Sequence, residues 1–245
     1  MSLAFRVIPT VLCRGRVLVK GSGFNPWRSV GLAAQAVLTH AARGVDEVCL
    51  LDVTATPEGR GPDLGLVEEL SEALFAPLSV GGGVRGVEDA RALLRAGADK
   101  VVVCSGGAKA VRQIAQVVGC QAVVGAVDYR ADGYVYTHCG RRELAISPVL
   151  WARELEAAGA GEILLTSIDR EGGLEGYDIK TLMQVAGAVN VPVVAHGGCS
   201  GYGDMEKAIK AGASAAAAGA LFQFTDATPH GAAAYLLERG IEARV

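Results

Sequence analysis

The sequence predicts a single (β/α)8 TIM-barrel domain over residues 1–245, and three observations lead to this prediction. Short apolar runs rich in β-branched residues alternate with helix-like stretches along the whole chain. The runs are continuously apolar, which is typical of strands covered on both faces. Similar segments also recur at a fixed offset of 115 residues, the separation of Glu47 from Glu162 and of Asp63 from Asp178. This duplication indicates two half-barrels, about 1–121 and 122–245, around one core.

Eight strands are predicted in order along the chain, at 6–12, 47–52, 78–82, 100–104, 122–128, 162–168, 192–196 and 215–219. Helix-like stretches follow seven of them, and helical periodicity is clear in Leu66, Leu70 and Leu74. The segment 13–30 contains three glycines and Pro26 and is too long for an ordinary connection between a strand and a helix. Loops of this length inside a barrel are more often functional than not.

The composition excludes several classes of function. The chain has 51% hydrophobic and 20% charged residues, and its net charge is −3. This balance argues against a general role on nucleic acid or on a membrane surface. No apolar run reaches the ~18 residues of a membrane span, and residues 1–16 lack a signal-peptide layout, so a cytoplasmic location is expected.

The cysteines and histidines predict neither a metal site nor a disulfide framework. The six cysteines form no CxxC pair, and the four histidines show no ligand spacing. We therefore expect no metal and no cofactor. Most cysteines fit small core residues, whereas Cys13 and Cys104 fall near predicted strand ends.

Glycines gather where predicted strands end, and in a TIM barrel the chemistry lies at these ends. Glycine lets backbone N–H groups approach an anion closely, and a following helix N-terminus adds partial positive charge. Because the glycines occur in both halves, we expect two phosphate cradles and a substrate with a phosphate at each end. The residues are Gly82, Gly83 and Ser105 in the first half, and Gly197, Gly198 and Gly219 in the second.

The same segments carry a family resemblance. In order, they read RVIP, VKG, LLDVTAT, SVGGGV, GADKV, AVDYRADG, GAGEILLTSIDREGGLEGYD and AAGALFQF. Over nearly the whole chain this resembles the cyclase subunit of imidazole glycerol phosphate synthase, a histidine-biosynthesis family. The resemblance implies a TIM barrel acting on a bisphosphorylated ribonucleotide. It also implies ammonia supplied by a glutaminase partner that docks at the N-terminal face of the barrel.

The resemblance further implies a ring of charges through which ammonia enters at the barrel floor, formed by Arg6, Glu47, Lys100 and Glu162. Elementary electrostatics supports the ring independently. Four charges at the starts of apolar strands are costly to bury unpaired, but two of each sign neutralise one another. A plain ion-pair network that plugs the floor is the alternative.

The family is expected to use two aspartates across the mouth as general acid and base. Asp128 matches the second aspartate, whereas the ungapped match places Leu12 at the first, and residues 1–45 contain no acidic residue. Glu171 also stands where the family has aspartate. Loss of one proton-transfer partner costs about 10²–10⁴ in rate. Leu12, together with the stretch NPWRSVG, resembles a paralogous branch that aminates sugars for surface glycans.

Other residues are candidates through the same resemblance. Lys20 in the long first loop is a candidate phosphate clamp or lid residue, with solvation as the alternative. His196 ends the seventh strand, where the family more often has a small residue, and is either a new titratable group or a polar filler. The remaining substrate or phosphate candidates are Thr166, Ser167, Asp169, Gly172 and Ala220.

Three functions remain open at this point. The first is an ammonia-using cyclase and lyase of histidine biosynthesis, in which Asp128 works alone or with water or His196. The second is a paralogous subunit that passes ammonia to a phosphorylated or nucleotide-linked sugar. The third is a non-catalytic barrel that keeps the phosphate sites.

Overall fold

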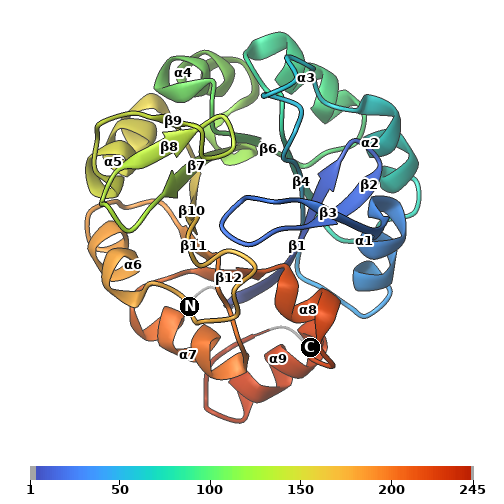
Figure 1. Ribbon diagram of the computed structural model, residues 1–245, viewed down its shortest axis with the longest axis vertical. Helices are drawn as coiled ribbons and strands as arrows, with labels where there is room; N and C mark the ends of the chain where they lie inside the picture. Colours follow the sequence, from blue (N-terminus) through green and yellow to red (C-terminus); the bar gives the residue numbers. More distant parts are fainter. Residues whose placement is uncertain (1–3, 244–245) are drawn as a thin grey trace.

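The computed structural model describes residues 4–243, and within them eight parallel strands close into a barrel (Figure 1). The strands pair in the order β1, β4, β5, β6, β7, β10, β11 and β12, and β12 returns to β1. Their bounds are β1 (Arg6–Arg14), β4 (Val48–Asp52), β5 (Leu78–Gly81), β6 (Lys100–Val103), β7 (Val123–Tyr129), β10 (Glu162–Ser167), β11 (Val193–His196) and β12 (Ala215–Ala218). The predicted TIM barrel is therefore confirmed, with each predicted strand in place.

Helices surround the barrel and cover the outer face of its strands (Figure 1). They are α1 (Ala33–Ala41), α2 (Leu64–Ser71), α3 (Val87–Arg95), α4 (Gly107–Val118), α5 (Pro148–Ala158), α6 (Ile179–Ala186), α7 (Tyr202–Lys210), α8 (Ala220–Phe224) and α9 (Pro229–Leu237), with a 3-10 turn η1 (Cys120–Ala122). Across residues 4–243, none of the helices has the length and apolar character required to cross a membrane.

The long segment expected as a loop at 13–30 is mostly a β-hairpin. β1 runs on to Arg14, and the chain then folds into β2 (Val17–Lys20) and β3 (Arg28–Leu32). The hairpin tip reaches over the centre of the barrel (Figure 1). A second extension, β8 (Val135–Thr137) and β9 (Arg142–Glu143), follows β7. Both extensions rise on the side of the strand carboxyl ends, the mouth of the barrel.

Strand periodicity sorts the barrel interior into layers, because alternate side chains point inward. Along β10, Glu162 lies at the floor, Leu164 in the middle and Thr166 at the mouth, while Ile163 and Leu165 pack outward. The middle layer is apolar and includes Ile8, Cys49, Val102, Val124, Leu164 and Val194. Charges are thus kept at the floor and reactive side chains at the mouth, with an apolar interior between them.

The sequence repeat reappears in the local geometry. Asp63 caps α2 by accepting from the Leu66 N–H, and Asp178 caps α6 by accepting from the Thr181 N–H. A Cβ at Gly82 would lie 2.3 Å from the Asp52 carbonyl oxygen, and one at the equivalent Gly197 would lie 2.5 Å from that of Ser167. Both glycines have positive φ. The same close approach of backbone therefore requires glycine in each half.

Candidate active site

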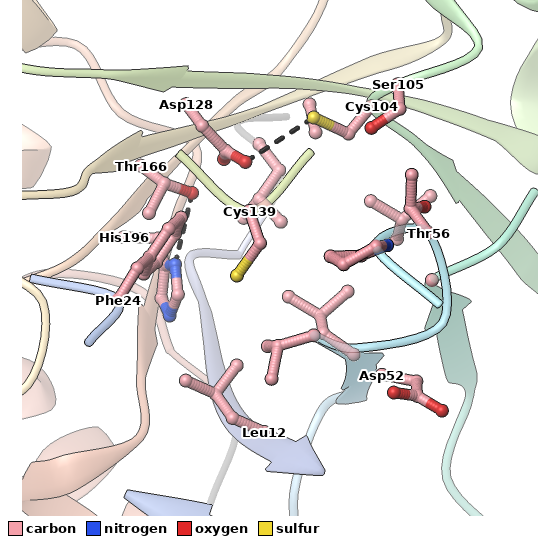
Figure 2. Close-up of a pocket in the computed structure, with 17 residues that line it drawn as sticks. Leu12, Phe24, Asp52, Thr56, Cys104, Ser105, Asp128, Cys139, Thr166 and His196 are labelled. Carbon is pink, nitrogen blue, oxygen red and sulfur yellow. Dashed lines mark hydrogen bonds between the residues drawn. The ribbon is translucent and has the colours of Figure 1, made fainter. Parts of the chain in front are cut away.

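A pocket of about 90 Å³ opens at the mouth of the barrel and is called the mouth pocket below. Its walls come from the ends of seven barrel strands and from the tips of both extensions, and the enclosing surface is mostly apolar. The lining residues used below are Leu12, Phe24, Asp52, Thr56, Gly82, Cys104, Ser105, Asp128, Cys139, Thr166 and His196 (Figure 2).

Asp128 extends into the mouth pocket from the end of β7. Burial disfavours its charged form and raises the pKa of Asp128 above the ordinary value. Hydrogen bonds from the Cys104 thiol, at 3.4 Å, and from the Thr166 hydroxyl oppose this effect without cancelling it. Asp128 is therefore a carboxyl group with increased proton affinity, as proton transfer near neutral pH requires.

Leu12 occupies the opposite side of the mouth pocket, from β1 (Figure 2). β1 and β7 are four strands apart around the ring in either direction, so their ends face one another. Leu12 is 6% exposed and presents hydrocarbon to the pocket. The position opposite Asp128 therefore carries no proton-transferring group.

His196 and Thr166 lie beside Asp128 at the same level of the barrel, since Thr166 is in register with both of them. The Thr166 hydroxyl is 3.2 Å from His196 Nδ1, and His196 Nε2 is 3.6 Å from Glu171 Oε2. Glu171, which follows β10, is itself buried. The strand end thus carries a buried chain of polar groups that joins Asp128 to Glu171.

The second predicted phosphate cradle forms one small cavity next to the mouth pocket. Its lining includes the three cradle candidates of the second half, Gly197, Gly198 and Gly219, together with the further candidates Gly172 and Ala220. Glu171 also lines this cavity and so separates it from His196. The structure brings these predicted residues together.

The first cradle is arranged differently. Gly82 and Ser105 line the mouth pocket, whereas the Gly83 N–H donates to Thr56 Oγ1 at 3.3 Å. Ser105 Oγ accepts from the His138 N–H at 3.0 Å. An anion in this cradle would therefore compete with Thr56 for the Gly83 N–H.

Three predicted binding residues point elsewhere in the structure. Lys20 Nζ lies 4.3 Å from the centroid of the Phe224 ring. Ser167 is the outward-facing neighbour of Thr166 on β10, and Asp169 forms an ion pair with Arg130 at 2.7 Å. Among the described pocket walls, none of the three takes part. Their binding roles remain predictions.

The four predicted floor charges contact one another and are called the floor ring below. Lys100 Nζ lies 2.8 Å from both Glu47 Oε2 and Glu162 Oε2, and Arg6 completes the ring by pairing with the same two glutamates. Burial alone would raise the pKa of Glu162, but Arg6 and Lys100 together hold it below its ordinary value. A small cavity lined by Ile8, Cys49, Val124 and Leu164 lies directly above the ring.

Sequence reasoning missed several residues of the mouth pocket. Phe24 and Cys139 come from the irregular tips of the two extensions, where no periodicity places a side chain. Asp52 at the end of β4 is held by Arg60 at 3.2 Å and by the N–H groups of Thr54 and Ala55. Its place at a strand end was a usable signal, since the chemistry of a TIM barrel lies at the carboxyl ends of its strands.

The fold and the site define a class of protein, the (β/α)8-barrel enzymes with a half-buried carboxyl group at the strand carboxyl ends. Residues 6–228 match the family described as "Histidine biosynthesis protein". The chain is 44% identical over 249 residues to the imidazole glycerol phosphate synthase subunit HisF of Hyphomonas neptunium, with 99% of both chains covered. It is 41% identical over 253 residues to the HisF subunit of Pyrobaculum aerophilum, with both chains fully covered.

The chain therefore belongs to the family of HisF, the cyclase subunit of imidazole glycerol phosphate synthase. A third relative, from Thermococcus gammatolerans, carries the same name at 41% identity over 249 residues. The comparisons support the first of the three functions. They give no support to the sugar-aminating subunit or to the non-catalytic barrel.

Proposed function

We propose that this chain is an active cyclase and lyase that adds ammonia to a bisphosphorylated ribonucleotide and that Asp128 transfers protons in the reaction. The observation that carries the proposal is the position of Asp128 in an apolar pocket where burial raises its pKa. Forming a C–N bond to ammonia and closing a ring both require a nitrogen to lose a proton. A partly buried carboxylate of raised pKa is suited to accept it.

The phosphate groups are proposed to occupy the two glycine cradles on either side of the mouth pocket. In the second half, backbone from Gly197, Gly198 and Gly219 lines one cavity. In the first half, Gly82 and Ser105 form part of the pocket wall. A substrate with a phosphate at each end would span the mouth and hold its reactive centre beside Asp128.

Ammonia is proposed to enter through the floor ring and to rise through the apolar middle layer. The small cavity above Glu47 and Glu162 supports this route. A glutaminase partner would dock on the floor side of the barrel. Phe75, in the connection that leads into β5, is fully exposed on that side and suits an aromatic anchor at an interface.

Turnover of the bisphosphorylated ribonucleotide with excess ammonium salt tests the proposed activity. Product should form with the isolated chain, and Asp128→Asn should lower kcat by at least about 10². A glutamine-driven assay with the glutaminase tests the partner. Phe75→Asp should lower glutamine-driven turnover only, whereas Met183→Asp, an exposed apolar position on α6, should change neither rate. Absence of ammonium-driven turnover by the wild-type chain would refute the proposed function.

A further inference from the structure

The mouth contains a buried ionisable pair that the proposed function does not use. The His196 side chain is 1% exposed and the Glu171 side chain is 7% exposed, with 3.6 Å between Nε2 and Oε2. Within the described residues, Nε2 has no hydrogen-bond partner. Leaving a buried polar atom unpaired is energetically costly. The unpaired Nε2 is therefore expected to have a role in the function of the site.

Thr166 connects this pair to Asp128. Its hydroxyl is 3.2 Å from His196 Nδ1 and also stabilises the Asp128 carboxylate by a hydrogen bond. A hydroxyl has one proton, so it donates either to the carboxylate or to the imidazole, but not to both at once. When Nδ1 accepts, the ring carries its proton on Nε2, which faces Glu171.

Among the described residues, the lining of the mouth pocket holds one further carboxylate besides Asp128, that of Asp52. β12, on one side, is a run of four alanines. Asp52, the second carboxylate of the mouth pocket, is occupied by Arg60. Burial keeps the pKa of the Cys104 thiol well above its ordinary value, so Cys104 stays a neutral donor. Asp128 and Glu171 are therefore the carboxylates that act on the imidazole.

We infer that His196 and Glu171 form a proton relay with Asp128 through Thr166, which supplies the second proton-transferring group that Leu12 cannot provide. This inference rests on the proposed function. In this relay His196 and Glu171 act through Asp128, so they are positioning residues for the proton transfer.

The transfer balances without any further reactant. Asp128 accepts a proton from the reacting nitrogen as the C–N bond forms. It passes this proton to Thr166 Oγ1 while the Thr166 hydroxyl gives its own proton to His196 Nδ1. The imidazolium that results directs its Nε2–H at the Glu171 carboxylate. Only O–H and N–H bonds break and form, and the reverse sequence returns the proton to the leaving group.

Three variants in the ammonium-driven assay test the relay. His196→Ser should lower kcat by about 10² and change KM by less than about threefold, because the His196 side chain is 1% exposed and offers the substrate little contact surface. Glu171→Gln keeps the shape, removes the charge and should lower kcat by at least about tenfold. The double variant Leu12→Asp with His196→Ser should recover at least about tenfold of the loss, since it restores a carboxylate opposite Asp128.

His196→Gly with added imidazoles separates a relay from a structural role. Rates restored by a series of substituted imidazoles should increase with their basicity if the ring moves a proton. A ring that only fills space would restore rates according to its size. His40→Ser is the matched control, because His40 is 3% exposed like His196 and has an unpaired ring nitrogen, but lies on α1 outside the mouth. It should leave kcat unchanged.

The outcomes separate this inference from the proposed function. If the wild-type chain turns over, Asp128→Asn abolishes turnover and both His196→Ser and Glu171→Gln retain full kcat, the relay is overturned and the proposed function stands. If the wild-type chain gives no product, both fall together. Imidazole rescue that follows size alone would also overturn the relay.

Discussion

At the scale of single residues, the proton affinity of Asp128 results from opposing neighbours. Burial raises its pKa, and the hydrogen bonds from Cys104 and Thr166 lower it. The reaction needs the carboxylate form, so activity is expected to fall as the pH falls through this raised pKa. The acid limb of the pH profile of kcat/KM should therefore lie above the range of an ordinary aspartate.

Cys104→Ala tests this balance. Removing the thiol donor raises the pKa of Asp128 further, so the acid limb should move to higher pH. At a pH on that limb, kcat/KM should drop by about threefold to tenfold, with no loss on the plateau. Cys13→Ala is the control, because Cys13 is buried on the outward face of β1. A limb that stays in place in both variants would rule out Cys104 as a partner of Asp128.

At the scale of elements, the β2–β3 hairpin closes over the mouth by packing on the loop after β10. The Gly23 N–H donates to the Glu171 carbonyl at 2.9 Å, and a Cβ on Gly172 would lie 2.1 Å from the Gly21 carbonyl oxygen. Phe24 is thereby placed over the pocket. The closed position of the hairpin depends on the absence of a side chain at Gly172.

Gly172→Ala is expected to push the hairpin away from the mouth. Trypsin should then cut after Lys20 or Arg28 at least about tenfold faster, because local opening exposes the backbone. Gly133→Ala is the matched control. Gly133 has φ 87° against 74° at Gly172, so both substitutions strain the backbone, but no atom lies within 4 Å of a Cβ at Gly133. Equal cleavage rates in the two variants would show that contact with Gly172 does not hold the hairpin.

The strands and the floor charges could be predicted from the sequence, whereas contacts between distant segments at the mouth could not. The strands were predictable because each is a short apolar run bounded by turns, and the floor charges because they begin such runs. The contact between Glu171 and His196 could not be predicted, because the two residues are 25 positions apart in the chain and α6 lies between them. The Lys20 side chain could not be placed either, because the hairpin pairing that directs it toward Phe224 has no periodic signal.

At the scale of the whole molecule, the floor ring joins strands from both predicted half-barrels. Glu162 on β10 shares Arg6 and Lys100 with Glu47, which precedes β4. The two glutamates are buried, so their charges depend on these partners. The ring therefore links the two halves by charge at the floor, below the apolar middle layer.

Lys100→Met should weaken this link and destabilise the fold by about 3 kcal/mol at neutral pH, the lower end for a broken buried pair because Arg6 remains. The direction in which this destabilisation changes with pH follows from Glu162, whose pKa is lowered in the folded state. Glu162 stabilises the fold at pH values above its pKa in the unfolded chain, and this stabilisation is lost as the pH falls through its pKa in the folded state. The difference in the free energy of unfolding between wild type and variant should therefore shrink in acid. Urea unfolding at several pH values measures both effects.

Lys210→Met is the control, because it breaks an exposed ion pair with Glu206 and should cost less than about 0.5 kcal/mol. An equal cost in both variants would show that the floor ring contributes no more than a surface ion pair.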